Sequence, residues 1–362
     1  MRTLVWSMRI GFTLLFIVLL GVTVWAWVSV QTPPRVIVEI KTKTEILGAA
    51  YKLYADENLG LWLARVVIHN RGPGAITQVR IRYSMGDLME PAEHTIDLIL
   101  PDQKVVDFYF PIIHESITQE TSGRSLPLRI EITYTQRNGR TVQKREERPI
   151  KVMGRNYLVW SSMPQDELLT WHDMFSNWFL VNVFITPNEE TTKYAAIQCA
   201  GGLNTSTDDR DRIQAWARIY YCLRQYGVKY FQEPSDNWTP HFNQYVQFPK
   251  ETLQRKGGTC LDLAILFASM AQALGIEAGV ALIPGHAIPY IRLSNGEYVF
   301  VESTIVDRQY AISHFADVVS RKVTFEEAYQ LATAQIQQAA QKGQIILVDY
   351  NQLRQVGVVS PW

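Results

Sequence analysis

The chain begins with an uninterrupted apolar run. Ile10–Val30 contains no charged residue, and a helix needs roughly 20 apolar residues to cross the hydrocarbon core of a bilayer. Trp6, Trp25 and Trp27 lie near the two ends of the run, where amphipathic rings prefer the membrane interface. The pattern predicts one transmembrane helix. The alternative is a cleaved secretory signal ending near Ala26, although the apolar core of such signals usually spans only about 7–15 residues.

The charges beside this run leave its orientation open. Arg2 and Arg9 precede it, while Arg35, Lys41 and Lys43 follow it, so the excess of cations that marks the cytoplasmic side is not evident. A short N-terminal tail before a long polar region is the usual layout of a signal anchor. We therefore expect residues 1–34 to form tail, anchor and linker, and the rest of the chain to lie outside the cytoplasm, in the periplasm or the extracellular space.

Residues 35–153 alternate apolar and polar side chains with a period of two. In Leu128–Tyr134 every second side chain is apolar, which is typical of a strand with one buried face. Asn138-Gly139 follows, a dipeptide favoured in tight hairpin turns because both residues tolerate a positive φ. The returning strand would then occupy residues 140–152. Short strands separated by such turns predict a β-sandwich of immunoglobulin type for this region.

Beyond this region the pattern becomes that of mixed helices and strands. Asp209–Tyr226 carries apolar residues at helical spacing, which predicts an amphipathic helix. Leu261–Leu274 is apolar nearly all round, as in a helix that is buried on every side. Three short apolar runs between residues 278 and 304 predict strands. Residues 154–362 are therefore expected to form an α+β domain.

The composition argues against two classes of function. Lys plus Arg and Asp plus Glu are balanced at 35 each, so no global field would attract nucleic acid. The 3 cysteines and 7 histidines show neither the CxxC nor the HExxH spacing of a zinc site. We expect no nucleic-acid partner, no metal and no cofactor.

Cys260 lies in a local pattern that typifies the start of a helix. Gly257-Gly258 precedes it, and Thr259-x-x-Asp262 is a variant capping box around it. The dipole and the free N–H groups at a helix N-terminus favour a thiolate, and the same N–H groups can hold an oxyanion. A lone cysteine in an apolar run is otherwise a small core residue, and position alone leaves both interpretations of Cys260 open.

The other two cysteines lack this context. Cys199 and Cys222 resemble small core residues, and Cys222 lies in the middle of the predicted amphipathic helix. The other interpretation is a disulfide between them, formed in an oxidising compartment.

An imidazole and a carboxylate follow on the strands after the buried helix. His286 lies between the predicted strands Ala278–Ile283 and Ala287–Leu293, and Glu302 lies in the third strand, Tyr298–Thr304. If the last two strands pair across their turn, His286 and Glu302 lie at neighbouring ends of a hairpin. A thiol at a helix start, an imidazole and a carboxylate together follow the triad logic of thiol catalysis.

These motifs resemble the transglutaminase-like superfamily, a branch of the papain-like folds. The similarity covers residues from about 209 to 304, through Gly-Gly-Thr-Cys260-Leu-Asp, Ala-Leu-Gly-Ile276, Pro-Gly-His286 and Glu302-Ser-Thr. The resemblance implies a papain-like domain in which Cys260 is the nucleophile and His286 is general base and later general acid. It also implies that Glu302 orients the imidazole.

Two positions depart from the family pattern. The family more often has Asp where Glu302 stands, and Asp307 is a rival third residue. Strand phase favours Glu302, because it shares one face with Tyr298 and Phe300. Leu261 stands where animal transglutaminases carry Trp after the nucleophile, which weakens the case for protein crosslinking.

An oxyanion donor is expected besides the Cys260 N–H group. Gln254, six residues before Cys260, and Gln247 are the candidates, and the favoured alternative for each is an ordinary surface amide. For Asp262, helix capping is the favoured role.

The function predicted from these residues is a membrane-anchored, extracytoplasmic thiol enzyme that cleaves or transfers a peptide or isopeptide amide through a Cys thioester. Water would make it a cysteine peptidase or amidase and an amine would make it a transamidase; we favour water. The expected partners are a protein or peptide substrate, the membrane, and proteins of the cell envelope. The alternative function is a non-catalytic scaffold or interaction module in a cell-envelope assembly, against which the presence of all three polar residues argues.

Overall fold

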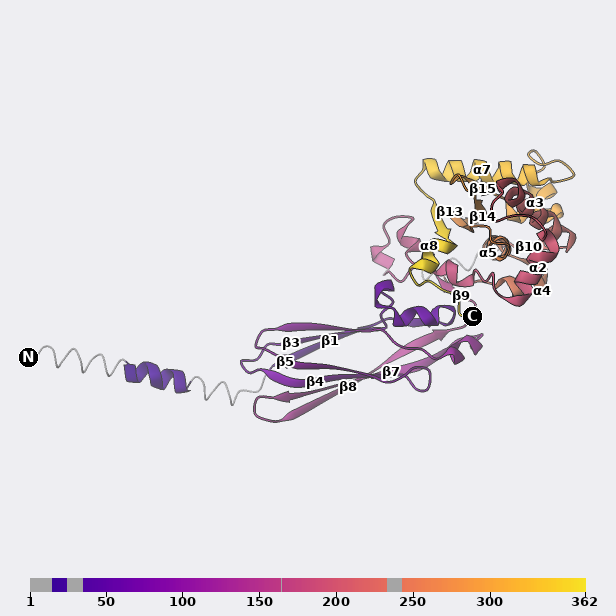
Figure 1. Cartoon of the computed structure of the whole chain (residues 1–362). Coiled ribbons are helices and arrows are strands. Elements are labelled where there is room, and N and C mark those ends of the chain that lie inside the picture. Colours follow the sequence, from indigo (N-terminus) through magenta and orange to yellow (C-terminus); the bar gives the residue numbers. More distant parts are fainter. Residues whose placement is uncertain (1–14, 25–34, 164, 233–242) are drawn as a thin grey trace, which may run out of the picture. The chain divides into compact units, whose positions relative to one another are not determined.

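The computed structural model describes residues 15–24, 35–163, 165–232 and 243–362. Backbone contacts divide the chain into two units, which are described separately (Figure 1). Unit 1 comprises residues 1–46, 60–114 and 124–151, and unit 2 comprises residues 47–59, 115–123 and 152–362. Segments 47–59 and 115–123 thus group with unit 2, whereas the domains predicted at 35–153 and 154–362 are continuous.

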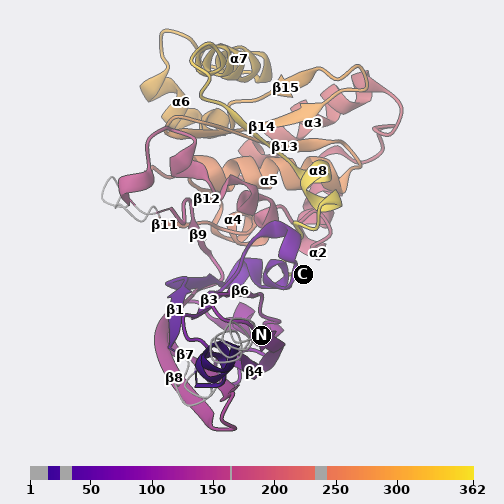
Figure 2. The ribbon, with the colours of Figure 1, turned by 90° about the vertical axis from the view of Figure 1, so that its left-hand side faces the viewer.

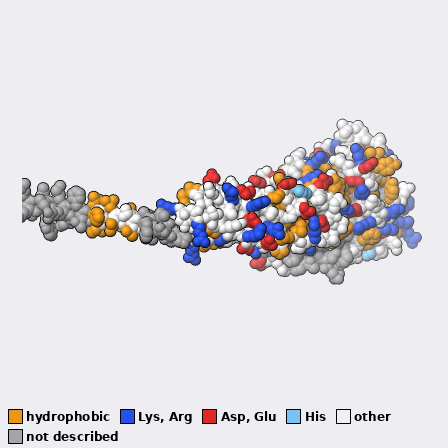
Figure 3. All heavy atoms as spheres, turned by 90° about the horizontal axis from the view of Figure 1, so that it is seen from below, with side chains coloured by type: hydrophobic (Ala, Val, Ile, Leu, Met, Phe, Trp, Pro, Cys, Tyr) orange, Lys and Arg blue, Asp and Glu red, His pale blue; other side chains and the backbone are white. Residues whose placement is uncertain are grey.

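The predicted membrane span, Ile10–Val30, lies largely outside the described residues. Its described part, residues 15–24, is helical, and its apolar side chains form an exposed surface in the space-filling view (Figure 3). Within the described parts of the chain, no helix has the length and apolarity that crossing a bilayer requires. The transmembrane helix therefore stays a prediction.

Unit 1 is built from two antiparallel sheets. Their strand orders are β1-β3-β6 and β2-β8-β7-β4-β5. The bounds are β1 Val36–Thr42, β2 Glu45–Leu47, β3 Ala64–Asn70, β4 Ile76–Ser84, β5 Ala92–Ile99, β6 Lys104–Tyr109, β7 Arg124–Gln136 and β8 Thr141–Met153.

The two sheets pack against each other through aromatic side chains. Tyr83 of β4 stacks on Tyr109 of β6, with 4.2 Å between the ring centroids, and its hydroxyl donates a hydrogen bond to Asp107. The hairpin predicted at Asn138-Gly139 is present, because Gly139 N donates to Gln136 O at 2.8 Å between β7 and β8. The β-sheet character predicted for this region is confirmed, and its assignment to the immunoglobulin type stays a prediction.

Unit 2 contains the remaining elements. Its helices are α2 Glu190–Ala200, α3 Asp209–Gln225, α4 Pro249–Arg255, α5 Cys260–Ala273, α6 Arg308–His314, α7 Phe325–Gln341 and α8 Tyr350–Gln355. Its strands are β9 Tyr157–Val159, β10 Lys229–Tyr230, β11 Asn243–Tyr245, β12 Gly257–Gly258, β13 Ala278–Ile283, β14 His286–Arg292, β15 Tyr298–Phe300 and β16 Ile346–Asp349. Short 3-10 segments are η1 Gly48–Ala55, η2 Glu57–Leu59, η3 Glu115–Gln119, η4 Gln165–Glu167, η5 Asp173–Phe175, η6 Trp178–Phe184 and η8 Ser303–Val306.

A four-stranded antiparallel sheet, ordered β15-β14-β13-β16, forms the centre of unit 2. Helix α5 packs on one face and α7 covers the other (Figure 2). Leu263 and Phe267 of α5 are fully buried, as expected of a helix that is apolar all round. Ile336 and Ala339 of α7 pack against Ile283 of β13. The sheet is therefore packed between α5 and α7.

The third strand of the predicted set is shorter than expected. We expected it over Tyr298–Thr304, but β15 ends at Phe300 and a 3-10 turn begins at Ser303. Glu302 caps this turn by accepting a hydrogen bond from Thr304 N at 3.0 Å. The polar side chain thus bonds the local backbone in place of a continued strand.

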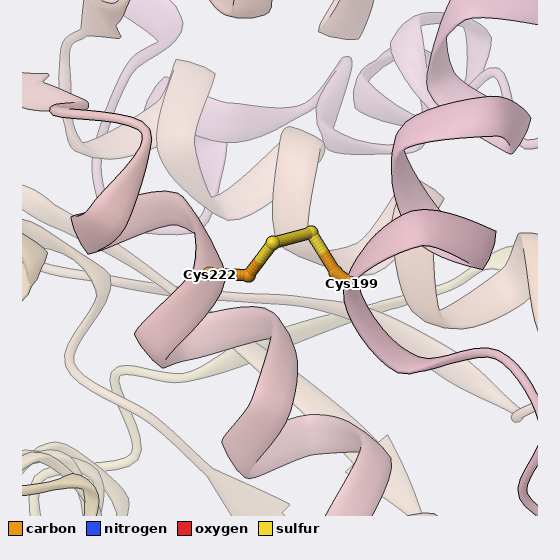
Figure 4. The surroundings of a disulfide bond; sticks show 2 residues. All are labelled: Cys199 and Cys222. Atoms are coloured by element: carbon orange, nitrogen blue, oxygen red, sulfur yellow. A yellow bond between two sulfur atoms is a disulfide. The ribbon is translucent and has the colours of Figure 1, made fainter.

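Helices α2 and α3 are joined covalently beside α5. Trp216 of α3 packs edge to face on Phe267 of α5, with 5.4 Å between the ring centroids. Cys222 of α3 forms a disulfide with Cys199 of α2, with an S–S distance of 2.04 Å (Figure 4). The disulfide interpretation is confirmed, and the interpretation of these two residues as free core thiols is wrong.

Replacing Cys199 and Cys222 together by serine should lower the free energy of unfolding. The bond spans a sequence separation of 23, and restricting an unfolded loop of that size corresponds to about 3 kcal/mol. Urea unfolding of the full-length chain, followed by tryptophan fluorescence, measures the change. Cys260→Ser is the matched control, because it removes a thiol and leaves the disulfide intact. An unchanged midpoint in the double variant would contradict the prediction.

Candidate active site

Cys260 is the first residue of α5, and a capping box holds it there. Thr259 Oγ1 accepts from Asp262 N at 3.4 Å, and Asp262 Oδ2 accepts from Thr259 N at 2.9 Å. The first intrahelical bond runs from Leu263 N to Thr259 O at 3.0 Å, so the N–H groups of Cys260 and Leu261 precede the helical ladder. The thiol is free and half-buried. The helix start predicted from the sequence, with Asp262 as its cap, is present.

Asp262 also fixes the segment that approaches the helix. Its carboxylate is buried and accepts hydrogen bonds from Gln247 N at 2.8 Å and Gln247 Nε2 at 3.0 Å. A Cβ on Gly258 would lie 2.6 Å from the Asp262 Cβ, so only glycine permits this approach. Burial raises the pKa of Asp262 to about 6, although hydrogen bonds from Gln247 and Thr259 oppose the increase.

A two-residue turn places His286 at the start of β14. Ile283 and His286 are paired across β13 and β14, and the turn between them contains Pro284 and Gly285, with a φ of +72° at Gly285. Proline followed by a residue of positive φ is typical of a type II turn. The imidazole of His286 lies beside the Cys260 thiol in the lining of one cavity, and its Nε2 lies 2.8 Å from Glu302 Oε2.

Glu302 is fully buried and binds the imidazole of His286. Its Oε2 lies 2.8 Å from His286 Nε2, while its Oε1 accepts from Thr304 N at 3.0 Å and Thr304 Oγ1 at 2.6 Å. Burial alone would raise the pKa of Glu302, but His286 and Thr304 outweigh it, so the pKa lies below 4.5. Burial alone would lower the pKa of His286, but Glu302 and the hydrogen bond with Cys260 raise it well above 6.5. The pair therefore favours a carboxylate and an imidazolium.

The rival carboxylate has other partners. Asp307 Oδ1 lies 3.2 Å from Lys229 Nζ, and it caps α6 by accepting from Gln309 N at 3.0 Å. The structure thus places Glu302, and not Asp307, against His286, although Glu302 lies beyond the end of β15 and not in the strand from whose phase it was chosen.

A cavity of about 230 Å³ lies beside the thiol and the imidazole. Its other walls come from elements far apart in the sequence. Aromatic rings and side-chain amides dominate them: Trp160, Phe175, Tyr230, Gln232, Asn243 and Gln244. Tyr230 and Gln232 precede residues 233–242, which lie outside the described residues, and Asn243 and Gln244 follow them. Trp160 and Phe175 carry no motif that would have linked them to Cys260.

Neither of the two glutamines considered as oxyanion donors lines this cavity. Gln254 lines a different cavity together with Arg155 and Glu189, so its candidacy as the oxyanion donor gains no support. The amide nitrogen of Gln247 is engaged by Asp262 and by Gly257 O at 3.4 Å. Gln247 therefore supports the start of α5. Among the residues that the structure describes, no three His, Cys, Asp or Glu side chains are grouped as a metal site would require.

The comparison with protein families matches residues 197–310 to the transglutaminase-like superfamily. This segment is a transglutaminase-like domain. A search of the curated proteins found no match to the chain. The transglutaminase-like domain contains α3, α5 and β13 to β15 and thus all three members of the Cys260–His286–Glu302 chain. The resemblance stated from the sequence motifs is confirmed at the level of the superfamily.

Replacing Glu302 by glutamine should lower the pKa of His286, because the variant removes the carboxylate that favours the imidazolium. Titration of the ring followed by NMR measures this pKa directly. Asp307→Asn is the matched control, since it removes a nearby carboxylate that does not contact His286. An unchanged titration of His286 in Glu302→Gln would contradict the assignment.

The same ion pair predicts a pH window of stability. Because the pKa of Glu302 lies below 4.5, its contribution is present above about pH 4.5 and is lost as the pH falls through the folded value. Because the pKa of His286 lies above 6.5, its contribution is complete below pH 6.5 and is lost as the pH rises through the folded value. The difference in thermal stability between wild type and Glu302→Gln should therefore be largest between about pH 4.5 and pH 6.5.

Proposed function

We propose that this chain is a thiol enzyme that cleaves a peptide or isopeptide amide. Cys260 would be the nucleophile, His286 the general base and later the general acid, and Glu302 the residue that orients the imidazole. The observation that carries the proposal is the arrangement of three side chains: His286, bonded to Glu302, lines the same cavity as Cys260, which stands at the N-terminus of a buried helix. The superfamily match of residues 197–310 supports it.

The proposed reaction is a two-step acyl transfer. The Cys260 thiolate attacks the amide carbonyl, and the N–H groups at the start of α5 stabilise the oxyanion. His286 gives its proton to the leaving amine, which departs and leaves a thioester on Cys260. The neutral imidazole then takes a proton from water, which attacks the thioester and releases a carboxylic acid and the free thiol. An amine in place of water would make the reaction a transamidation, and we favour hydrolysis.

We further propose that residues 10–30 anchor the chain in a membrane, with unit 2 outside the cytoplasm. The uncharged run Ile10–Val30 supports the anchor. The disulfide between Cys199 and Cys222 supports the compartment, because structural disulfides persist in oxidising environments.

Loss of the thiol should abolish activity. Cys260→Ala should not cleave any member of an internally quenched peptide library that the wild type cleaves, and His286→Gln should cleave it roughly 10²–10⁴-fold more slowly. His114→Gln, which changes a half-buried histidine of unit 1 that pairs with Glu90, is the control and should retain activity. The scaffold alternative requires instead that Cys260→Ala matches wild type in every assay, including its cellular phenotype.

The reactivity of the thiol tests the same site without a substrate. Because Cys199 and Cys222 are joined, iodoacetamide should label Cys260 alone, and the informative quantity is the rate. At pH 6.5 only about 1% of an ordinary thiol is ionised, so His286→Gln should slow alkylation roughly 10-fold or more. Equal rates in His286→Gln and wild type would oppose an activated thiolate.

Membrane attachment is tested by deleting residues 10–30. The full-length chain should remain in the membrane fraction after extraction at alkaline pH, and the deleted form should become soluble, because the apolar run would be its only strong hold on lipid. Recovery of a shortened wild-type chain in the soluble fraction would indicate a cleaved signal instead.

A further inference from the structure

A second cavity, of about 430 Å³, is also lined by His286. It shares Tyr230, Ile283, Gly285 and His286 with the cavity that contains Cys260. It also contacts Glu302, but Cys260 does not line it. The imidazole therefore borders two neighbouring cavities, one lined by the thiol and one lined by the carboxylate.

The second cavity has polar walls and one uncompensated positive charge. The C-terminal part of α7 and the following loop supply Gln335, Gln338, Lys342 and Gln344. Lys342 is exposed, and no ion pair joins it to a carboxylate of the described ranges. The other charged groups in the walls are His286 and Glu302, which neutralise each other. A ligand in this cavity therefore meets a cation that pairs with no carboxylate among the residues that the structure describes.

The same wall contains an unused hydrogen-bond acceptor. The side-chain Oε1 of Gln335 is buried and has no hydrogen-bond partner in the part of the chain that the structure describes. A buried acceptor without a partner has a free-energy cost that a donor from a ligand would remove. An amide N–H next to a carboxylate would complement Gln335 and Lys342 together.

The scissile amide bond has an acyl side and an amine side, and the chemistry of acyl transfer indicates which of the two each cavity can accept. The acyl carbon must reach the thiol, which lines only the first cavity. The leaving nitrogen must lie beside the thiol and the imidazole nitrogen that Glu302 does not bind. The substrate chain beyond that nitrogen can extend past His286 into the second cavity, which Cys260 does not line. The amine side of the scissile bond is therefore the part that the second cavity can accept.

We propose that this second cavity binds the amine side of the substrate and that Lys342 selects amine-side residues that carry a carboxylate. The inference rests on the proposed function. In the first cavity, His286 is the only lining residue of the described chain with an ionisable side chain other than the thiol and Tyr230. The substrate class that fits both cavities is thus a peptide or isopeptide with an uncharged acyl side and an acidic amine side.

Cleavage of paired peptides tests the selection. Internally quenched peptides with an uncharged acyl side would carry either glutamate or lysine on the amine side. Wild type should cleave the glutamate series with the higher kcat/KM, and Lys342→Gln should reduce that preference about 2–5-fold, the range of an exposed ion pair. Lys342→Glu should reverse it. Lys193→Gln, which changes an exposed lysine of α2 outside both cavities, is the matched control and should leave the preference unchanged.

Peptide binding to an inactive variant tests the role of the second cavity separately from the proposed thiol chemistry. In full-length Cys260→Ala, ligand-observed NMR should show a short free-amine peptide beginning with glutamate binding more tightly than its lysine counterpart. Adding Lys342→Glu should reverse that order. Equal binding of the two peptides, or an order unaffected by Lys342, overturns the role of this cavity and leaves the proposed thiol chemistry intact. A binding preference in a chain whose wild type cleaves no peptide overturns the proposed function instead.

Discussion

A fully buried carboxylate, that of Glu302, is the constraint around which the candidate active site is arranged. An ionised group removed from water must be paired and hydrogen bonded, and His286 and Thr304 provide those partners. Because Thr304 is only two residues away, the chain must leave β15 after Phe300 and turn back on the carboxylate. The pairing thus shapes the backbone locally and at the same time holds the imidazole in one orientation, with its other nitrogen available to the thiol.

The thiol is held by an independent set of contacts. Thr259 and Asp262 cap α5, and Gln247 binds the buried Asp262 carboxylate from the approaching segment. This network specifies where the helix begins and therefore which N–H groups remain free beside Cys260. The packing of α5 on the central sheet then brings the helix start to the end of β14, where His286 begins the strand. Neither half of the site depends on the other for its position, so removing the thiol should leave the imidazole and its carboxylate in place.

The two cavities differ in the charge of the side chains that line them. The cavity beside Cys260 is lined by aromatic rings and amides, while the one beside Glu302 carries the unpaired ammonium of Lys342. In the proposed reaction, a substrate that extends into both cavities would pass His286, which borders both. The disulfide between Cys199 and Cys222 joins α2 and α3, and both of these helices pack against α5.

The sequence by itself determined the features that depend on neighbouring residues. The cap around Cys260 is encoded within four positions, and the capping of the turn after β15 by Glu302 involves only residues two apart. The tertiary structure decided what depends on residues far apart: that Trp160 lines the thiol cavity, that Gln254 faces a different cavity, and that two cysteines on separate helices are joined. Capping and periodicity are local and recur along the chain, whereas the packing of α5 against distant segments leaves no repeat or spacing in the sequence to be recognised.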